Sequence, residues 1–452
     1  MKKDTVLKIL IGITAGILAV LLAIAVMISI DRPQSTAPAT TTATQVTTVP
    51  TQPTTVATEP PIVKESTFTL AATGDLLMHV AVMNTGKTSD GYNFDSIFTY
   101  FKNYVSAADL ATANLETTLA SNNNGYAYKG YPRFNCPDEI VDGAINAGFD
   151  LLLTSNNHAY DTSTTGLNRT VDVIREKGIL NLGTKDTADE PDFLVVEENG
   201  IKLGLMCYTY ETNSSPDKKA PNGLTMKNAD APLMNTFDYT NLDLFYKEVR
   251  NSMTQMDTQG ADAVVLFIHW GNEYQTKQNK KQTVIAQALC DLGVDVIIGG
   301  HPHVVQPVDL LTSSKDESHK TVCLYSMGNA VSNQRRAKMN LKTGHTEDGV
   351  LFSVTFARYT DGTVILESAD LLPTWVNLDT HPETGKKAYM ILPLDDTLED
   401  WKTAFSLSDS GLKNAKASYE RTVKITGAGM EKVNAYLTQN QADTEAAIGA
   451  EK

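Results

Sequence analysis

Short runs of apolar residues recur along the chain from about residue 67 onward. They are rich in aliphatic and β-branched side chains, most end in Gly, Asn or His, and they cover residues 68–72, 110–113, 151–154, 203–208, 263–268 and 294–298. Between several of these runs, apolar residues repeat at spacings of three and four, as in residues 94–104, 140–147 and 284–289. Strands that alternate with amphipathic helices are typical of an α/β core with buried parallel strands.

Beyond residue 303 the alternation gives way to consecutive strand patterns, over residues 304–311, 322–327, 349–358 and 363–371. We expect these strands to be antiparallel and to complete a second sheet. After about residue 394 the chain becomes more polar and its pattern is mainly helical. We therefore predict a globular domain over residues 67–394 and a helical appendage over residues 395–452, which packs on the domain rather than carrying a separate activity.

The first 66 residues have a different character. Residues 9–30 contain no charged residue, and a helix over them would be about 33 Å long, enough to cross the ~30 Å hydrocarbon core of a bilayer. Lysines occur in residues 1–8, which predicts a cytoplasmic tip and a single-pass anchor running from inside to outside. The alternative is a cleaved signal peptide, but its apolar region usually has about 7–15 residues.

Residues 31–66 form a segment rich in Thr and Pro that has too few large apolar side chains to offset the entropy of ordering the backbone. We predict a disordered stalk that holds the globular domain outside the cell membrane. A plain unstructured spacer would serve the same purpose.

Composition narrows the function classes. The 452 residues include 38 Lys and Arg against 53 Asp and Glu, a formal charge of -15, which argues against a nucleic-acid-binding protein because such affinity comes from phosphate neutralisation by basic side chains. The four cysteines are too few and too scattered for a disulfide framework or a Cys-rich zinc site.

Chemistry-bearing residues gather where the predicted strands end. The segments are Gly74 to His79, Asn114 to Glu116, Ser155 to Asp161, His269 to Tyr274 and Gly299 to His303. In an open α/β sheet, ligands bind outside the carboxyl ends of the strands, where such loops converge. Five of the eight histidines lie in these segments, so we interpret them as parts of one site rather than as separate polar residues.

Carboxylate, amide and imidazole groups suit hard or borderline divalent metals. A pair of cations needs a bridging carboxylate and several terminal ligands. We expect Glu116 to bridge, with Asp75 on one side. The ligands expected on the other side are Asn157, His269 and His301.

The motifs Gly-Asp-x-x-x-His, Asn-Leu-Glu, Asn-Asn-His-x-x-Asp, His-Trp-Gly-x-Glu-Tyr and Gly-His-x-His-x-x-Gln together resemble those of the bacterial capsule-synthesis family of the CapA type, which is linked to poly-γ-glutamate. The resemblance covers about residues 67–373. That family is similar to the calcineurin-like metallophosphoesterases, which implies a four-layer αββα sandwich of two sheets between helices.

The resemblance also implies roles. Asp75 and His303 would hold one metal, Glu116 would bridge, and His158 would donate a proton or contact phosphate. The second metal would be held by Asn157, His269 and His301. Metallophosphoesterases usually have Asp-x-His in the first motif, whereas His79 lies four positions after Asp75 and would ligate from a rearranged loop or only contact substrate. The bridging residue is also Glu rather than Asp, which leaves an unchanged phosphatase mechanism in doubt.

Five further residues complete the candidate site. Asp161 either orients His158 or caps the following helix. Glu273 and Tyr274 either contact substrate or pack within their loop, and Arg133 is either an anion clamp or, as we slightly favour, an exposed surface charge. Asn329 is assigned to substrate contact because residues 325–329 also resemble a family segment.

Two functions are compatible with these observations. The first is a metal-dependent hydrolase or transferase of metallophosphoesterase type, with two divalent ions (Mn, Fe, Zn or Mg) acting on a phosphoester or a polymer acyl bond during capsule assembly. The second is a non-catalytic assembly, export or anchoring factor that binds the anionic polymer through the same site. In either case the expected partners are an anionic capsule or envelope polymer, the membrane and a membrane-embedded polymer synthase, without nucleic acid.

Overall fold

The computed structural model describes residues 62–123, 125–212 and 218–450. The predicted tip, anchor and most of the predicted stalk lie outside these residues. Within the described part of the chain, no helix is both long and apolar enough to cross a membrane. Residues from Glu59 to Lys452 form one compact unit, which is the subject of the following description.

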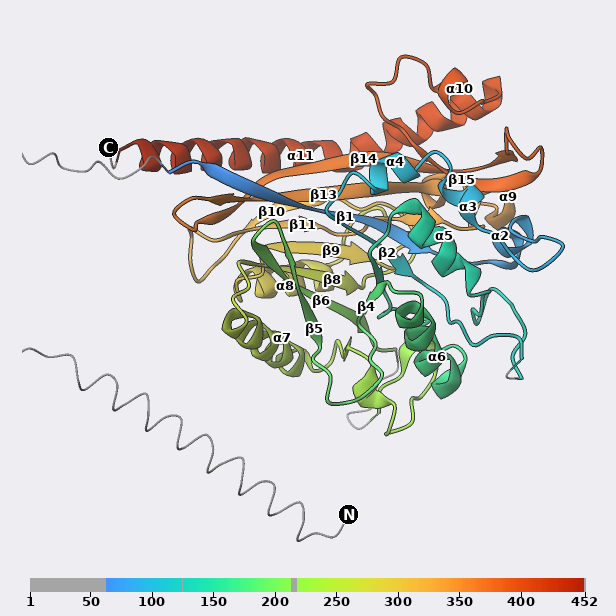
Figure 1. The fold of residues 1–452 in the computed structure, drawn as a ribbon, viewed down its shortest axis with the longest axis horizontal. Coiled ribbons are helices and arrows are strands. Elements are labelled where there is room, and N and C mark those ends of the chain that lie inside the picture. Colours follow the sequence, from blue (N-terminus) through green and yellow to red (C-terminus); the bar gives the residue numbers. More distant parts are fainter. Residues whose placement is uncertain (1–61, 124, 213–217, 451–452) are drawn as a thin grey trace, which may run out of the picture. The chain divides into compact units, whose positions relative to one another are not determined.

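Two mixed β-sheets make the centre of this unit (Figure 1). The eight strands of the first sheet are, in spatial order, β15 (Lys387–Pro393), β14 (Val364–Thr380), β13 (Asp348–Tyr359), β1 (Lys64–Leu76), β2 (Leu110–Leu115), β3 (Leu151–Leu153) and β4 (Leu180–Leu182), with β12 (Asn329–Val331) paired to β1. The second sheet consists of β10 (Val308–Thr312), β11 (Lys320–Leu324), β9 (Val296–Gly300), β8 (Ala263–His269), β6 (Ile201–Tyr210) and β5 (Phe193–Glu198), with β7 (Thr236–Phe237) paired to β6.

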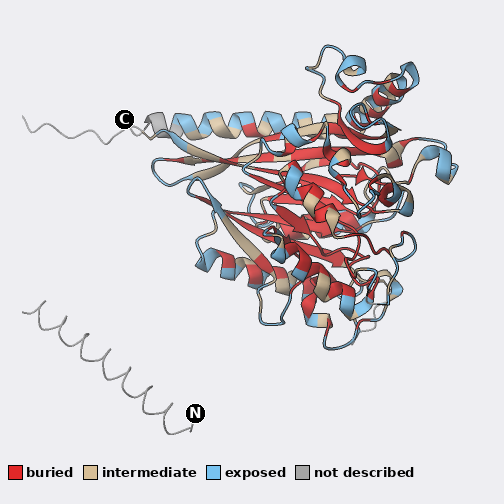
Figure 2. Ribbon diagram, turned by 45° about the vertical axis from the view of Figure 1, so that its right-hand side comes forward, coloured by how far each residue is buried: buried red, intermediate tan, exposed pale blue. Residues whose placement is uncertain are grey.

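The two sheets pack face to face through one apolar core. Phe68 and Leu70 of β1 belong to the same cluster as Leu205 of β6 and Val265 of β8. The inner strands are buried on both faces, against the other sheet on one side and against helices on the other. This explains why their sequences are nearly continuously apolar. Figure 2 shows the buried residues concentrated in the two sheets.

Helices cover the outer faces. Along the first sheet lie α2 (Val80–Thr85), α3 (Asp95–Phe98), α4 (Lys102–Val105), α5 (Glu139–Ala147) and α6 (Ser163–Glu176). Along the second lie α7 (Leu242–Thr258) and α8 (Lys280–Cys290). The outer cores are formed by residues such as Phe98 and Ile140 on one side and Phe245 and Ile285 on the other. The two-sheet α/β architecture implied by the motifs is therefore confirmed.

The expectation for the late strands was wrong in part. The strand predicted over residues 304–311 begins only at Val308, and β10 and β11 do join the second sheet. However, β13 and β14 belong to the first sheet, where β13 pairs antiparallel with β1 in a register that sets Phe68 opposite Phe356. Local patterning identifies a strand but not its partner, and here the partner is close to the other end of the described chain.

The remaining described helices are α9 (Arg336–Met339), α10 (Trp401–Ala404) and α11 (Asp409–Ala450), with short 3₁₀ turns η1 (Pro221–Gly223), η2 (Ala231–Leu233) and η3 (His345–Glu347). The segment expected to be helical after residue 394 thus contains α10 and α11. Val433 and Leu437 of α11 lie in the core between the sheets, so this helix extends the layer formed by the second sheet. All four cysteines are buried and free.

Substitution of two glycines on α11 tests how closely this helix must approach the second sheet. A Cβ atom at Gly429 would clash with the carbonyl oxygen of Val308 in β10, whereas at Gly427 the nearest atom would be Val423 Cγ1 at 3.8 Å. We expect Gly429→Ala to lose about 1–3 kcal/mol of unfolding free energy because the helix must move away from β10. The control Gly427→Ala should gain up to ~1 kcal/mol because alanine is the better helix former. Urea denaturation of both variants measures this, and equal stability of the two would contradict the packing described.

Candidate metal centre

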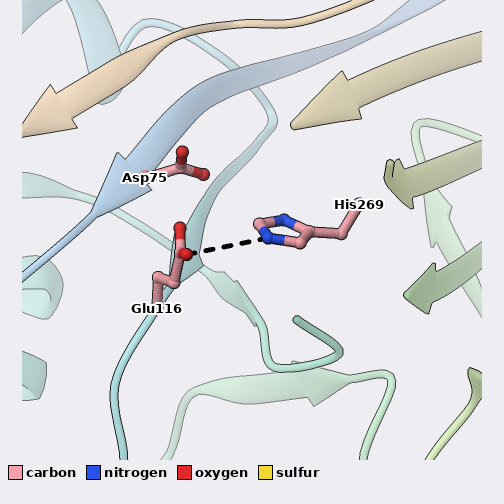
Figure 3. A group of neighbouring side chains, drawn as sticks. All are labelled: Asp75, Glu116 and His269. Carbon is pink, nitrogen blue, oxygen red and sulfur yellow. Dashed lines mark ion pairs between the residues drawn. The ribbon is translucent and has the colours of Figure 1, made fainter. Parts of the chain in front are cut away.

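The carboxyl ends of strands from both sheets bring the polar side chains together. Asp75 lies at the end of β1, Glu116 follows β2, and His269 is the last residue of β8. Ligand atoms of these three buried residues all lie within 4.8 Å of one another. Figure 3 shows the three side chains pointing toward one another, with His269 coming from the opposite sheet to Asp75. This group could hold a metal ion.

Glu116 is the focus of the cluster. Its Oε1 atom lies 3.9 Å from Nε2 of His158, 3.7 Å from Nε2 of His269 and 3.8 Å from Nε2 of His303. This oxygen is buried and has no hydrogen-bond partner among the described residues. Unsatisfied buried oxygen atoms are rare and need an explanation. One oxygen that faces three imidazole nitrogens beyond hydrogen-bond distance fits a divalent cation held between them.

Asparagine side chains fix the carboxylates. Asn114 Nδ2 donates to Asp75 Oδ1 at 2.7 Å and lies 3.5 Å from Glu116 Oε2. Asn156 Nδ2 in turn donates to Asn114 Oδ1 at 3.0 Å. Such outer partners set the orientation of metal-binding groups. Sequence reasoning did not assign a role to Asn114 or Asn156, although both lie inside the segments singled out at the strand ends.

His303 connects Asp75 to Glu116. Its Nδ1 atom is 3.0 Å from Asp75 Oδ2 and 3.2 Å from Asn329 Oδ1, and its Nε2 atom faces Glu116. Burial alone would lower the pKa of His303, but the charges of Glu116 and Asp75 raise it to about 9. Burial likewise would raise the pKa of Glu116, yet His303 and His269 hold it below its usual value. The carboxylates of Asp75 and Glu116 thus favour a positive charge at this point of the structure.

Asn329 lies next to Asp75 in the sheet, because β12 pairs in parallel with β1 and sets the two residues in register. Its Nδ2 atom donates to the backbone oxygens of His303 at 3.2 Å and Thr346 at 3.0 Å. The structure therefore places Asn329 behind His303. Substrate contact stays a prediction for Asn329, and the contacts that the structure shows are with His303 and Thr346.

A second set of donors surrounds His269. Asn157 Oδ1 lies 2.7 Å from His269 Nε2, and the His301 ring is 4.9 Å from the His269 ring. His301 Nδ1 is buried without a hydrogen-bond partner in the described part of the chain. Burial lowers the pKa of His301 well below its usual value, so this imidazole is neutral, which is the form that binds metals. Asn157, His269 and His301 are brought together as expected.

The loop after β9 is strained. His301 has φ 94° and His303 has φ 56°, conformations that residues other than glycine rarely adopt. Each such residue costs about 1–3 kcal/mol, and strain of this kind gathers at functional sites. With this backbone conformation, both His301 and His303 direct their imidazoles toward the same cluster.

His158 is held by a separate network. Its Nδ1 atom is 2.7 Å from Asp161 Oδ2, which also accepts the Phe134 N–H at 2.6 Å. Asn222 Nδ2 donates to Asp161 Oδ1 at 3.0 Å. Burial would lower the pKa of His158, but Asp161 raises it above its usual value. Of the two roles considered for Asp161, these contacts favour orienting His158 over capping α6.

Asn222 was missed because it lies in η1, far along the chain from the motifs, and has a left-handed φ of 49°. No local pattern marked it. Tyr210, whose ring lies 4.7 Å from the His301 ring, was missed because it ends an ordinary apolar strand. Both become recognisable only when the strand ends are placed side by side.

The other expected site residues lie around the cluster. The His79 ring packs edge-on against Phe134 at 5.2 Å, and its Nδ1 atom accepts from the Asn333 N–H at 3.3 Å. Burial lowers the pKa of His79 to about 4. Phe134 also contacts the His158 ring, with a centroid distance of 4.7 Å, so the two imidazoles share this aromatic neighbour.

Arg133, Glu273 and Tyr274 lie at the rim. Arg133 and Glu273 are exposed, and the Tyr274 ring is 6.3 Å from the His303 ring while its hydroxyl accepts from Gln334 Nε2 at 3.3 Å. Of these three, Tyr274 alone has an aromatic contact with the cluster. The exposure of Arg133 agrees with the reading of a surface charge.

Two curated proteins are similar to this chain. The capsule biosynthesis protein CapA of Bacillus anthracis is 25% identical over 308 residues, which cover 67% of this chain and 67% of that protein. The PGA biosynthesis protein CapA of Bacillus subtilis (strain 168) is 26% identical over 272 residues, 60% of this chain and 64% of that protein. The chain thus spans about two thirds of the length of these relatives.

Among solved structures, the NAD nucleotidase NadN of Haemophilus influenzae matches with a TM-score of 0.40 and 11% identity, covering 85% of this chain and 68% of that chain. The family model described as bacterial capsule synthesis protein PGA_cap matches residues 69–334, more than half of the chain and every strand end that builds the cluster. The chain belongs to the bacterial capsule synthesis protein family PGA_cap.

Proposed function

We propose that this protein acts in the synthesis of an anionic capsule polymer of the poly-γ-glutamate type, as a metal-dependent hydrolase or transferase. The observation that carries the proposal is the convergence of three imidazole Nε2 atoms on the buried, unpartnered Oε1 of Glu116. The names of the two CapA relatives support the biological context. The bond attacked would be a phosphoester or an acyl bond of the polymer.

The donor set fits two divalent ions in the manner of a metallophosphoesterase. Asp75 and His303 would hold the first ion, and Glu116 would bridge. The second ion would be held by Asn157, His269 and His301. Carboxylate, amide and neutral imidazole ligands suit Mn, Fe, Zn or Mg. When bound, such ions act as Lewis acids that polarise the substrate and stabilise negative charge developing on oxygen.

His158 is the residue placed to move a proton. Its Nδ1 atom is fixed by Asp161, so its Nε2 atom points into the cluster toward Glu116. Asp161 raises the pKa of His158, which favours the protonated imidazole that can donate to a leaving oxygen or nitrogen. Asn222 holds Asp161 from the other side and so preserves this orientation.

We further propose that the globular unit works outside the cell membrane, held by residues 9–30 and spaced by the stalk. There it would meet the growing polymer and a membrane-embedded synthase. The charge-free stretch and the preceding lysines support this arrangement. Protease treatment of intact cells tests it, since cleavage of the globular unit is expected only if that unit is outside.

The alternative is a protein that binds the polymer through the same centre without cleaving it. Metal ions would then serve as receptors for the polymer carboxylates. The two functions share the metal centre and differ only in turnover, so metal binding and turnover are measured separately.

Substitution of Glu116 tests metal binding. Glu116→Gln keeps the shape of the side chain but removes the charge on which the three imidazoles converge. Loss of an outer partner already costs about 10- to 100-fold in metal affinity, and we expect loss of this ligand to exceed that range. Titration calorimetry with Mn²⁺ and Zn²⁺ measures it. The matched control is His319→Gln, because His319 is half-buried and its Nε2 atom faces the Val294 carbonyl. Equal metal affinity of the two variants would contradict a metal centre at Glu116.

Substitution of His158 separates catalysis from metal binding. His158→Gln should retain metal and lower turnover by about 100- to 10,000-fold, the usual contribution of a general acid. Hydrolysis of a chromogenic phosphodiester and of γ-glutamyl oligomers is followed in parallel. Turnover that persists at the wild-type rate would remove the role of His158. If the metal-loaded wild-type protein hydrolyses neither substrate, the result supports the alternative function, binding of the polymer without cleavage.

A further inference from the structure

A cleft of about 470 Å³ lies between α9, η3 and α11. Its polar lining includes three arginines, Arg335, Arg336 and Arg421, together with Glu347 and Asn414. The protein carries a formal charge of -15, so a cleft lined by three guanidinium groups is an exception in its surface.

Two of the arginines are held in place. Arg421 donates from Nε to Asp348 Oδ2 at 2.7 Å and from Nη2 to Asp348 Oδ1 at 2.5 Å. Arg335 Nη1 donates to the backbone oxygen of Val376 at 2.9 Å, and its Nη2 lies 3.8 Å from Glu347 Oε2. These contacts fix the two side chains before any ligand binds, which lowers the entropy cost of binding.

Arg336 is the exposed member. Its backbone N–H donates to Glu347 Oε1 at 2.9 Å, so the start of α9 is fixed while the side chain is exposed. The carboxylates of Glu347 and Asp348 are already engaged by Arg335, Arg421 and Trp375. The charged side chains that line the cleft are three guanidinium groups and one carboxylate, that of Glu347.

The chain segment that lines the cleft begins beside the metal centre. Asn333 donates its N–H to His79, and Gln334 Nε2 donates to the Tyr274 hydroxyl at the rim of the centre. Arg335 and Arg336 are the next residues along the chain. Consecutive Cα atoms are about 3.8 Å apart, so Asn333 and Arg336 are separated by at most ~11 Å. Arg336 in the cleft therefore lies within ~11 Å of Asn333, which contacts His79.

We propose that this cleft binds the carboxylate groups of an anionic polymer whose reacting bond lies at the metal centre. The inference rests on the proposed function, for which it supplies the substrate-binding subsite. The exposed guanidinium group of Arg336 can match a carboxylate in a bidentate geometry that an ammonium group cannot reproduce. The cleft would thereby select a polymer with regularly spaced carboxylates.

The test measures binding of poly-γ-glutamate oligomers to the full chain by calorimetry, with metals removed by a chelator so that no turnover is needed. Arg336→Gln should weaken binding about tenfold, and Arg336→Lys should restore only part of the affinity. The matched control is Lys338→Gln, an exposed cation on the same short helix that does not line the cleft, which should bind like the wild type. Thermal melting of each variant checks that the fold is intact.

Equal affinity of Arg336→Gln and Lys338→Gln would overturn the proposal. Polyphosphate of similar length that binds as tightly, with the same dependence on Arg336, would overturn the assignment to carboxylates. Polymer binding that depends on Arg336 in a protein without turnover would refute only the hydrolase function. Turnover with no effect of Arg336 on polymer affinity would refute only the cleft.

Discussion

A carboxylate removed completely from water is the constraint on which this structure depends. Glu116 has no exposed surface, and an isolated buried charge is costly unless other groups compensate it. The compensation comes from imidazoles on three separate segments, carrying His158, His269 and His303. Because both sheets contribute, the centre exists only when the sheets are packed face to face.

The groups around the centre form two tiers. The inner tier consists of oxygen and nitrogen atoms that could hold a cation, and the side-chain amides of the outer tier fix the positions of these groups. Asn114 fixes Asp75, and Asn329 supports His303 from behind. The Asp348–Arg421 pair then ties α11 to the chain segment that carries Thr346, whose carbonyl oxygen accepts from Asn329. Fold stability and site geometry are therefore linked through the same polar contacts.

The sequence predicted the inner tier well because short-range signals suffice for it. Apolar runs that end in Asp75, Glu116 or His269 identify parallel strands, and parallel strands place their ends at one edge. The local sequence pattern does not show which strands pair with each other, so the prediction placed β13 and β14 in the second sheet instead of the first. Asn222 was missed for the same reason, since its contact with Asp161 spans separate parts of the chain. Asn329 was found by its motif, yet its role behind His303 follows only from the register of β12 with β1.

The position of β1 has a consequence for how the protein matures. This strand lies between β2, its next neighbour along the chain, and β13, which is synthesised far later. Folds dominated by such distant pairings form slowly because the loop must close before the contacts are gained. The surroundings of Asp75 are therefore complete only after most of the polypeptide has been synthesised, so an ion held there would be acquired by the finished chain rather than by the nascent one.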